Sequence, residues 1–442
     1  MASYKDREAF IPYRRADIIE LCIEDGHLPD SDAQKFRDFC SILVAYYHFK
    51  FHSYQERLKD NYAPFSPDAA TKSRVEPTPD QLENMETQLI DDFNTILERA
   101  NYIPISKNSL KKAFEERSLI SVKTEVDLNN FDELACYYRG NVYRTTQVQK
   151  LFRKVEMKIN TFERVVLLIK FKNKNYFTEQ GDDLEALDFQ PGKTYLYFYK
   201  NIPKFDLELL FPNIKIKMTW KDRLMLIVPG IGAAVPVILK ILPKLLIIVG
   251  AILFFTLGPS FIDNLNVNEE DVRNIMPVLV AVLSLLIALG GFAYKQYSKY
   301  KSKHIKFRKK VTDTLFFKNM ANNASVFQSL IDAAEEAECK EMILVYYHLL
   351  TSKKALTPQQ LDSQIETWMD QKFDTKIDFD INGPIRNLGD IQGKLVENKK
   401  DSASKSEISL LKKDSQGNCH VLPLEKAKSL LDYVWDNIFD YT

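Results

Sequence analysis

The chain has 442 residues, a length that suits two or three domains. Its 60 basic and 60 acidic residues give a formal charge of zero, so composition offers no support for broad nucleic-acid affinity. The 5 cysteines are far apart and lack CxxC spacing, which suits isolated thiols in a reducing compartment better than disulfides or zinc. These observations exclude a polycation and a disulfide scaffold.

Residues 1–222 predict an N-terminal α+β domain on the cytoplasmic side, with helices first and strands later. Asp17 or a neighbour is expected to cap a short first helix. Runs of β-branched and aromatic residues then indicate strands, because such side chains fit a pleated, half-buried surface. We expect helices at 36–54, 79–100 and 107–116, and strands at 163–172 and 194–199.

Two long apolar stretches in the middle of the chain predict a transmembrane region at residues 223–294. Residues 275–294 carry no charge and match the ~20 residues that cross a bilayer. The stretch 224–258 would be ~52 Å long as a single helix, so we divide it into two elements. The predicted order is an interfacial or re-entrant helix at 224–239, a span at 240–258, an external loop at 259–274 and a span at 275–294. A three-pass arrangement is the alternative.

Basic residues flank this region on both sides, and such residues are retained in the cytoplasm. A basic juxtamembrane helix is expected at 295–322, and both termini should face the cytoplasm. Retention of these basic residues on the cytoplasmic side is by itself enough to explain the basic run that follows residue 294. Contact with anionic lipid headgroups is a second explanation, since each cation adds ~1 kcal/mol near such a surface. The candidate lipid contacts are Lys295, Lys299, Lys301, Lys303, Lys306, Arg308, Lys309 and Lys310.

Small residues recur along the second expected span at spacings of three, four and three. The candidate packing residues are Ala281, Ser284, Ala288 and Gly291. This spacing places them on one helical face, where they allow close packing against the first span or against a second subunit. Small residues are also common in any such helix. Neither span contains Asp, Glu, His or Arg, which disfavours a proton or ion path.

Residues 323–442 predict a second cytoplasmic domain with three helices, a hairpin and a closing helix. Thr357 is a plausible N-cap of the second helix. The order resembles a winged-helix domain, but the candidate recognition helix carries only Arg386, which favours protein interaction over base reading. Lysines of the polar tip keep nucleic-acid binding as the alternative. The expected helices cover 323–350, 358–372, 383–392 and 424–439, and strands at 394–397 and 420–422 flank a polar tip at 398–418.

Four segments of the chain resemble one known family. They are FIPYRRADIIEL near the N-terminus, CYYRGN from Cys136, YLYFYKNIPKFDLELLFPNIKIKMTWKDRLML from Tyr195 and LIDAAEEAECKEMILVYYHLL from Leu330. In these segments the chain is similar to the DUF3754 family, which includes transmembrane protein 143. The resemblance implies membrane helices and a membrane or mitochondrial location, without established catalytic residues. Because the chain lacks the presequence of animal mitochondrial relatives, we expect a bacterial plasma membrane or an organelle membrane.

No catalytic motif accompanies these features, since HExxH, GxxxxGK[ST], GxGxxG and GxSxG are all absent. We therefore expect no enzyme activity, no metal site and no cofactor. The predicted function is a membrane-anchored scaffold or regulatory protein that binds membrane lipids and a protein partner, alone or as a homo-oligomer. The alternatives are a membrane-tethered nucleic-acid binder and an oligomeric channel or transport accessory. Nucleic acid is the less expected partner.

Overall fold

The computed structural model divides into two compact units, each formed by segments that are distant in sequence. Unit 1 consists of Met1–Arg117, Leu128–Leu207 and Lys318–Thr442, and unit 2 of Ser118–Asp127 and Glu208–Phe317. Unit 1 thus combines segments that the sequence analysis assigned to separate N-terminal and C-terminal domains. The structure describes residues 3–4, 8–68, 74–115, 123–150, 153–217, 283–284, 287, 290–295, 297–299, 301–302, 305–306, 308–309, 311–313, 315–394 and 407–439.

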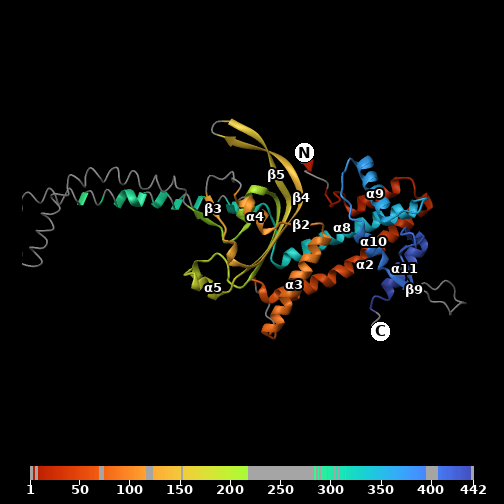
Figure 1. The fold of residues 1–442 in the computed structure, drawn as a ribbon, viewed down its shortest axis with the longest axis horizontal. Coiled ribbons are helices and arrows are strands. Elements are labelled where there is room, and N and C mark those ends of the chain that lie inside the picture. The colour runs from red at the N-terminus through yellow and green to blue at the C-terminus, as the bar shows by residue number, and fades with distance from the viewer. Residues whose placement is uncertain are drawn as a thin grey trace, which may run out of the picture. The chain divides into compact units, whose positions relative to one another are not determined.

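Unit 1 contains a six-stranded antiparallel sheet (Figure 1). Its strands are β1 Ser3–Tyr4, β2 Ile103–Pro104, β4 Phe131–Lys150, β5 Arg153–Phe171, β6 Thr194–Pro203 and β8 Asn319–Asn322. The order is β1-β4-β5-β6-β8, and β2 also pairs with β4. β4 and β5 form a long hairpin, whose register runs from Phe131 opposite Phe171 to Lys150 opposite Arg153.

The central side chains of β5 explain its place in the middle of this sheet. Residues 165–169 (VVLLI) are almost completely buried, as expected for a strand that is covered on both faces. On β4, Gly140 has a φ of 73°, and a Cβ there would come within 2.6 Å of Glu163, so glycine is required. The strands expected at 163–172 and 194–199 are therefore present, whereas β4 has no counterpart among the predicted strands.

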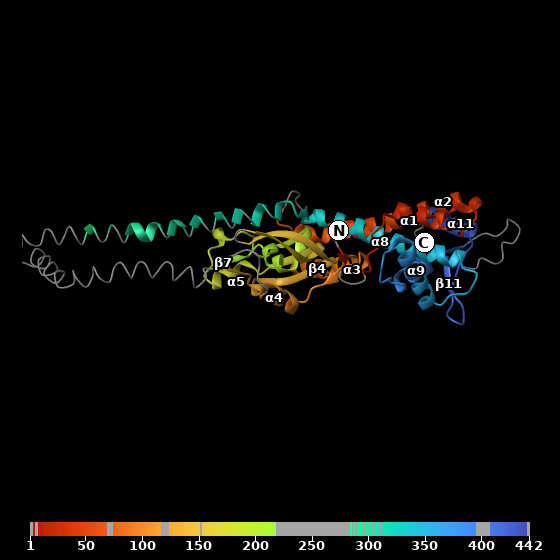
Figure 2. The ribbon, with the colours of Figure 1, turned by 90° about the horizontal axis from the view of Figure 1, so that it is seen from above.

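Helices form the rest of unit 1. They are α1 Arg15–Glu24, α2 Asp30–Tyr62, α3 Pro79–Arg99, α4 Lys107–Glu115, α5 Lys174–Glu179, α8 Ala324–Thr351, α9 Pro358–Phe373, α10 Asn382–Gly389 and α11 Leu424–Asp436. α8 is central, because α1, α2, α3, α9 and α10 all contact it (Figure 2). Aromatic rings join α2 to α8, as where Phe39 stacks on Tyr346 with centroids 4.1 Å apart. α8 is thus buried by helices from both ends of the chain.

Two helix starts in unit 1 follow from local sequence. Thr78 and Thr357 each accept a hydrogen bond from the backbone three residues on, and each forms a capping box with the glutamine there. The predicted N-cap at Thr357 is therefore confirmed. α1 instead begins after Arg14, and Asp17 lies in its first turn, 2.8 Å from the Arg14 guanidinium. The expected capping by Asp17 is wrong, because its carboxylate binds the arginine.

The C-terminal strands form two hairpins in place of the single predicted one. β9 Gln392–Lys394 pairs with β10 Glu407–Ser409, and β11 Leu411–Lys413 pairs with β12 Cys419–Val421. The strands expected at 394–397 and 420–422 therefore do not pair with each other, which corrects the winged-helix resemblance. The physical reason is that Leu410 and Leu411, assigned to the polar tip, are buried and hold the strands on either side of them against the core.

Unit 2 contains a short sheet in which β3 Lys123–Glu125 pairs antiparallel with β7 Lys215–Lys217. Thr124 Oγ1 donates to Glu208 Oε2 at 2.7 Å, and burial raises the pKa of that glutamate. Asn213 Nδ2 donates to the carbonyl oxygen of Asp127 at 2.8 Å. These contacts join the two segments of unit 2.

The predicted membrane spans have no counterpart among the helices that the structure describes. None of these helices is both long enough and apolar enough to cross a bilayer. α8 has the length, at 28 residues, but it carries charged residues between Glu335 and Glu341. The predicted membrane-protein fold and the integral, multi-pass localisation are corrected accordingly. The elements expected at 224–239, 240–258 and 259–274, with most of 275–294, lie outside the described residues.

Candidate functional site

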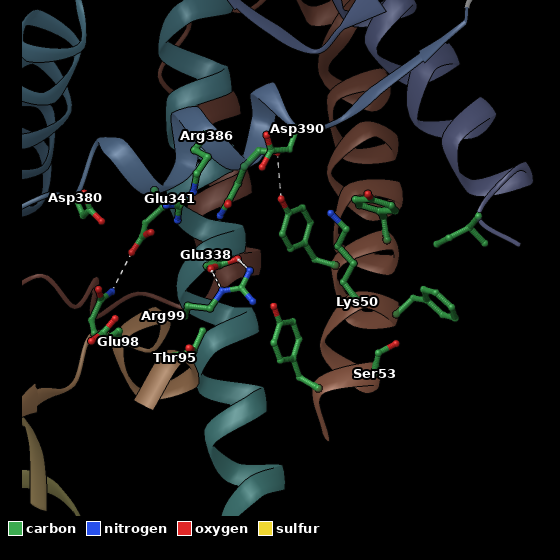
Figure 3. A pocket seen from close by; sticks show the side chains of 18 residues that line it. Lys50, Ser53, Thr95, Glu98, Arg99, Glu338, Glu341, Asp380, Arg386 and Asp390 are labelled. Atoms are coloured by element: carbon green, nitrogen blue, oxygen red, sulfur yellow. Dashed lines mark hydrogen bonds and ion pairs between the residues drawn. The ribbon is translucent and has the colours of Figure 1, made fainter. Parts of the chain in front are cut away.

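A cavity of about 850 Å³ opens between four helices of unit 1 (Figure 3). Its lining includes Tyr46, Tyr47, Lys50, Ser53 and Tyr54 of α2, Thr95, Glu98 and Arg99 of α3, Glu338 and Glu341 of α8, and Asp380, Arg386 and Asp390 in and beside α10. Helical periodicity selects these positions. On α8, for example, the two glutamates are three residues apart and so lie on the same face.

One acid of this wall, Glu338, is fully engaged with a cation. Arg99 Nε donates to Glu338 Oε1 at 2.5 Å, and Arg99 Nη2 donates to Oε2 at 3.2 Å. The Arg99 guanidinium also lies over the rings of Phe51 and Tyr54, at 4.7 and 5.2 Å from their centroids. This paired geometry satisfies both oxygens of a buried carboxylate. The pair therefore joins α3 to α8 and neutralises its own charge.

The second acid, Glu341, is buried without a cation. Asn101 Nδ2 donates to Glu341 Oε1 at 2.9 Å, and within the described part of the chain no hydrogen bond reaches Oε2. The pKa of Glu341 is raised to about 8, mainly by burial; the Asn101 hydrogen bond opposes the shift, and the charges of Glu338 and Asp380 add to it. Glu341 is therefore mostly protonated at neutral pH.

Of the cations that line the cavity, Lys50 lies apart from Glu341, whereas Figure 3 shows Arg386 near it. Lys50 Nζ lies over the rings of Tyr46 and Tyr47, at 4.7 and 5.5 Å from their centroids. Figure 3 shows Glu341, Asp380 and Glu98 toward one end of the cavity and Lys50 toward the other. Carboxyl groups and the Arg386 side chain thus lie at one end of the cavity, and the Lys50 ammonium group lies on aromatic faces at the other.

A second, much smaller cavity of about 50 Å³ shares Asn101 and Glu341 with the first. Its wall contains Lys340, which donates to the carbonyl oxygens of Ile11 and Tyr13 at 3.1 and 2.7 Å. Burial lowers the pKa of this lysine, and the nearby charge of Glu336 opposes the shift. Lys340 is thus committed to the backbone before α1, and it leaves Glu341 without a cation in direct contact.

This arrangement can take up or release a proton near neutral pH at Glu341 Oε2, and it can accept a hydrogen bond there from a ligand. Among the described residues, no group of three or more His, Cys, Asp or Glu side chains could hold a metal ion. The five cysteines are buried and free. The distinctive chemistry of the cavity therefore belongs to one carboxyl group and its neighbours.

Comparison with known families identifies a different part of the chain. Residues 162–325 match the model of a family described as a protein of unknown function, DUF3754. Over this range the chain is similar to DUF3754, and the match covers less than half of its length. The predicted resemblance is confirmed over this range, whereas the closer likeness to transmembrane protein 143 is not confirmed. No solved structure matches the chain. The DUF3754 region includes β6 and ends in the first turn of α8, so the cavity residues all lie outside it.

The residues predicted as sites lie near the end of the DUF3754 region and do not line the cavity. Of the candidate lipid contacts, Lys295, Lys299, Lys301, Lys306, Arg308 and Lys309 are exposed residues of helical segments, and Lys303 and Lys310 lie outside the described residues. In the candidate packing face, Ser284 and Gly291 are helical and exposed, and Ala281 and Ala288 lie outside the described residues. Both roles stay predictions. Arg386 does reach the cavity wall.

The sequence contains a signal for the cavity that the motif search does not use. α8 is otherwise an apolar helix, yet residues 335–341 read EEAECKE, with four glutamates and one lysine, and most of these side chains are buried. Charged residues are almost never fully buried unless they are paired. Such a run in the middle of an apolar helix indicates partners elsewhere in the chain. Arg15, His48, Arg99 and Asn101 are the partners in this structure.

Proposed function

We propose that the chain is a regulatory protein that acts by binding a small ligand in the cavity between α2, α3, α8 and α10. The observation that carries this proposal is Glu341, a buried carboxyl group with one oxygen that faces a cavity of about 850 Å³. Within the described residues Oε2 accepts no hydrogen bond, and a carboxyl oxygen is a good acceptor. A ligand donor at this position therefore finds a free acceptor.

The lining of the cavity suits a small organic molecule. Binding sites for such molecules are concave and combine aromatic side chains with a few well-placed polar groups. Here Tyr46, Phe49 and Tyr54 supply the aromatic surface, while Ser53 and Thr95 supply hydroxyl groups. Volume, aromatic area and convergent polar groups therefore support binding.

The cavity also offers a route from ligand binding to a protein partner. Phe49, which lines the cavity, packs against Trp435 and Phe439 with ring centroids 6.3 and 5.2 Å apart. Both rings are exposed, Trp435 in the last turn of α11 and Phe439 just after that helix. A ligand that contacts Phe49 changes how Phe49 packs against Trp435 and Phe439. Large exposed apolar side chains such as these two are common contacts in protein interfaces. We assign the regulatory output to this pair.

Thermal unfolding of the full chain with a mixed compound set tests the proposal. The set should contain amines, carboxylates and neutral aromatics, and the control is Ser53→Trp, which fills the cavity from an exposed position. A ligand at 100 times its Kd stabilises the folded state by ~2.7 kcal/mol. We expect at least one compound class to raise the Tm of the natural chain and not that of Ser53→Trp. The proposal fails if no compound raises the Tm, or if both proteins respond equally.

A further inference from the structure

We propose that the cavity binds a small organic ammonium ion, whose N–H groups donate to Glu341 Oε2 and to the Asp380 carboxylate. This inference rests on the proposed function, because it names the ligand of the same cavity. It depends on three observations. Glu341 Oε2 accepts no hydrogen bond within the described residues, the carboxyl groups near it form no ion pair, and Arg99 and Lys50 are held by other groups.

The carboxyl groups at one end of the cavity form no ion pair within the described residues, although Arg386 lines the cavity beside them. Asp380 is exposed, and its Oδ1 accepts a hydrogen bond from the Asn382 backbone at 3.1 Å. Glu98 is also exposed, and in the described structure no Lys or Arg forms an ion pair with Glu98, Glu341 or Asp380. Three carboxyl groups thus share one end of the cavity and none of them is ion-paired within the described residues, so a cationic ligand finds free carboxyl oxygens there.

The cations already present are held elsewhere. Arg99 is bound to both oxygens of Glu338 and lies on two aromatic rings, while Lys50 lies on the rings of Tyr46 and Tyr47. Figure 3 shows these side chains away from Glu341. Neither of these cations therefore competes for Oε2. Arg386 also lines the cavity, but within the described residues it forms no ion pair with Glu341 or Asp380, so both carboxyl groups are open to an ammonium group.

Binding should release a proton. Burial keeps Glu341 mostly neutral at pH 7, since its pKa is raised to about 8. An ammonium ion at Oε2 favours the ionised form, so the carboxyl proton passes to solvent and an ion pair remains. The charged and titratable groups that face Glu341 are Glu336, Glu338 and Lys340 of α8, Glu98 and Arg99 of α3, Arg139 of β4, and Asp380 and Arg386 in and beside α10. Four of these groups are acidic and four are basic, so their formal charges cancel. The carboxyl groups that favour a cation are those without an ion pair in the described structure, Glu98, Glu341 and Asp380.

Isothermal titration calorimetry of the full chain tests this inference. The probes are 1,5-diaminopentane and spermidine as free amines, and the blocked peptide acetyl-Gly-Lys-Gly-amide as a side-chain amine. Each is measured at pH 7 and pH 9 in two buffers of different ionisation enthalpy, which reports the protons released. The variants are Glu341→Gln and, as a matched control, Glu335→Gln. Glu335 is a buried glutamate of the same helix that is paired with Arg15 and His48 and does not line the cavity.

We expect a probe to bind the natural chain with release of about 0.9 protons at pH 7 and about 0.1 at pH 9, as follows from a carboxyl pKa near 8. Glu341→Gln should weaken binding at least about tenfold and remove the proton release, because a charged hydrogen bond is lost. Glu335→Gln should bind as the natural chain does. Tighter binding of the free amines identifies a small metabolite-like amine, and tighter binding of the peptide identifies a lysine side chain.

The inference is overturned if no probe binds, or if Glu341→Gln binds with unchanged affinity and proton release. Should Glu341→Gln fail to fold, Asp380→Asn at an exposed position serves in its place and should weaken amine binding severalfold. Failure of the inference is distinct from failure of the proposed function. If amines do not bind while another compound class still raises the Tm of the natural chain and not of Ser53→Trp, only the ligand assignment is wrong.

Discussion

Two carboxyl groups in unit 1, Asp25 and Glu341, are both shielded from water, yet their pKa values shift in opposite directions. Burial alone would raise the pKa of Asp25, but the Lys372 ammonium and hydrogen bonds with Tyr347 and His27 hold it well below the usual range. Glu341 has only the Asn101 amide, and its pKa is raised to about 8. The number of donors therefore decides the charge state of each. Asp25 belongs to a completed contact between α1, α8 and α9, whereas Glu341 keeps an oxygen for a donor from outside.

The largest expected change in stability comes from breaking the ion pair between Arg99 and Glu338, which lies beside Glu341. Arg99→Met should lower the free energy of unfolding by about 3–5 kcal/mol, because it leaves the buried Glu338 carboxylate without its cation. Urea unfolding monitored by circular dichroism measures the change. The matched control is Arg57→Met, which removes a more exposed arginine paired with Asp92 and should cost at most about 1 kcal/mol. Equal costs for the two variants would show that Glu338 is solvated.

Glu341→Gln should change how stability depends on pH. The natural chain keeps a proton on Glu341 up to about pH 8, whereas the unfolded chain releases it near 4.3. Between these values the unfolded state binds fewer protons, so the stability of the natural chain falls as pH rises. Glutamine does not titrate, so we expect Glu341→Gln to gain about 1–3 kcal/mol relative to the natural chain between pH 5.5 and 8.5.

Urea unfolding at a series of pH values measures this difference. Glu335→Gln is the control, because that residue is already paired with Arg15 and His48 and its removal leaves the titration of Glu341 in place. Parallel stability curves for Glu341→Gln and the natural chain would contradict the raised pKa of Glu341, and with it the proton release expected on ligand binding.

The contrast between the two carboxyl groups also shows which features can be predicted from the sequence and which cannot. Local signals predicted Thr357 as a cap and residues 163–172 as a strand, since a capping box and a β-branched run act over a few neighbouring residues. The partners of Asp25 and Glu341 are set by packing between distant segments: Tyr347 lies 322 residues from Asp25, and Asn101 lies 240 residues from Glu341. The residues next to Asp25 and Glu341 in the sequence therefore do not indicate these distant partners.

Pairing between strands was equally out of reach. β4 carries many charged and polar residues along its length, so it lacks the alternation that marks a strand, and its structure depends on the register with β5. In the C-terminal segment, the two short hairpins replace one because Leu410 and Leu411 enter the core. The apolar stretches at 224–258 and 275–294 are plain in the sequence, yet no described helix supports the membrane fold inferred from them.

His348 provides a further test near Asp25, because its ring packs against Tyr347 and Trp368. Burial lowers the pKa of His348 to about 4, below the ordinary value of 6.5. The unfolded state therefore binds more protons between pH 6.5 and 4, and stability is lost as pH falls through that window. His348→Phe should flatten this slope by about 1–3 kcal/mol, as measured by urea unfolding. His52→Phe, at an exposed position of α2, should retain the natural slope.

The smallest effect belongs to Asp25 itself, because its donors include the exposed His27 and the half-exposed Lys372. Asp25→Asn should cost about 1 kcal/mol at pH 7, since exposed partners contribute little and Tyr347 keeps an acceptor. A carboxyl whose pKa is depressed stabilises the fold above its ordinary pKa of 3.8, and that stability is lost as pH falls below it. Asp25→Asn should therefore remove the loss of stability below pH 4 and leave the behaviour above pH 5 unchanged.

A double-mutant cycle between Asp25→Asn and Lys372→Met, measured by urea unfolding at pH 7, isolates the contribution of one donor. We expect a coupling free energy of about 0.5–1 kcal/mol, because the Nζ to Oδ1 distance is 2.8 Å but the lysine is half exposed. Zero coupling would mean that the other hydrogen-bond donors, chiefly the buried Tyr347 hydroxyl, keep Asp25 ionised without the lysine. In that case the difference between Asp25 and Glu341 arises from neutral hydrogen bonds alone, and a neutral donor in the cavity would suffice to ionise Glu341.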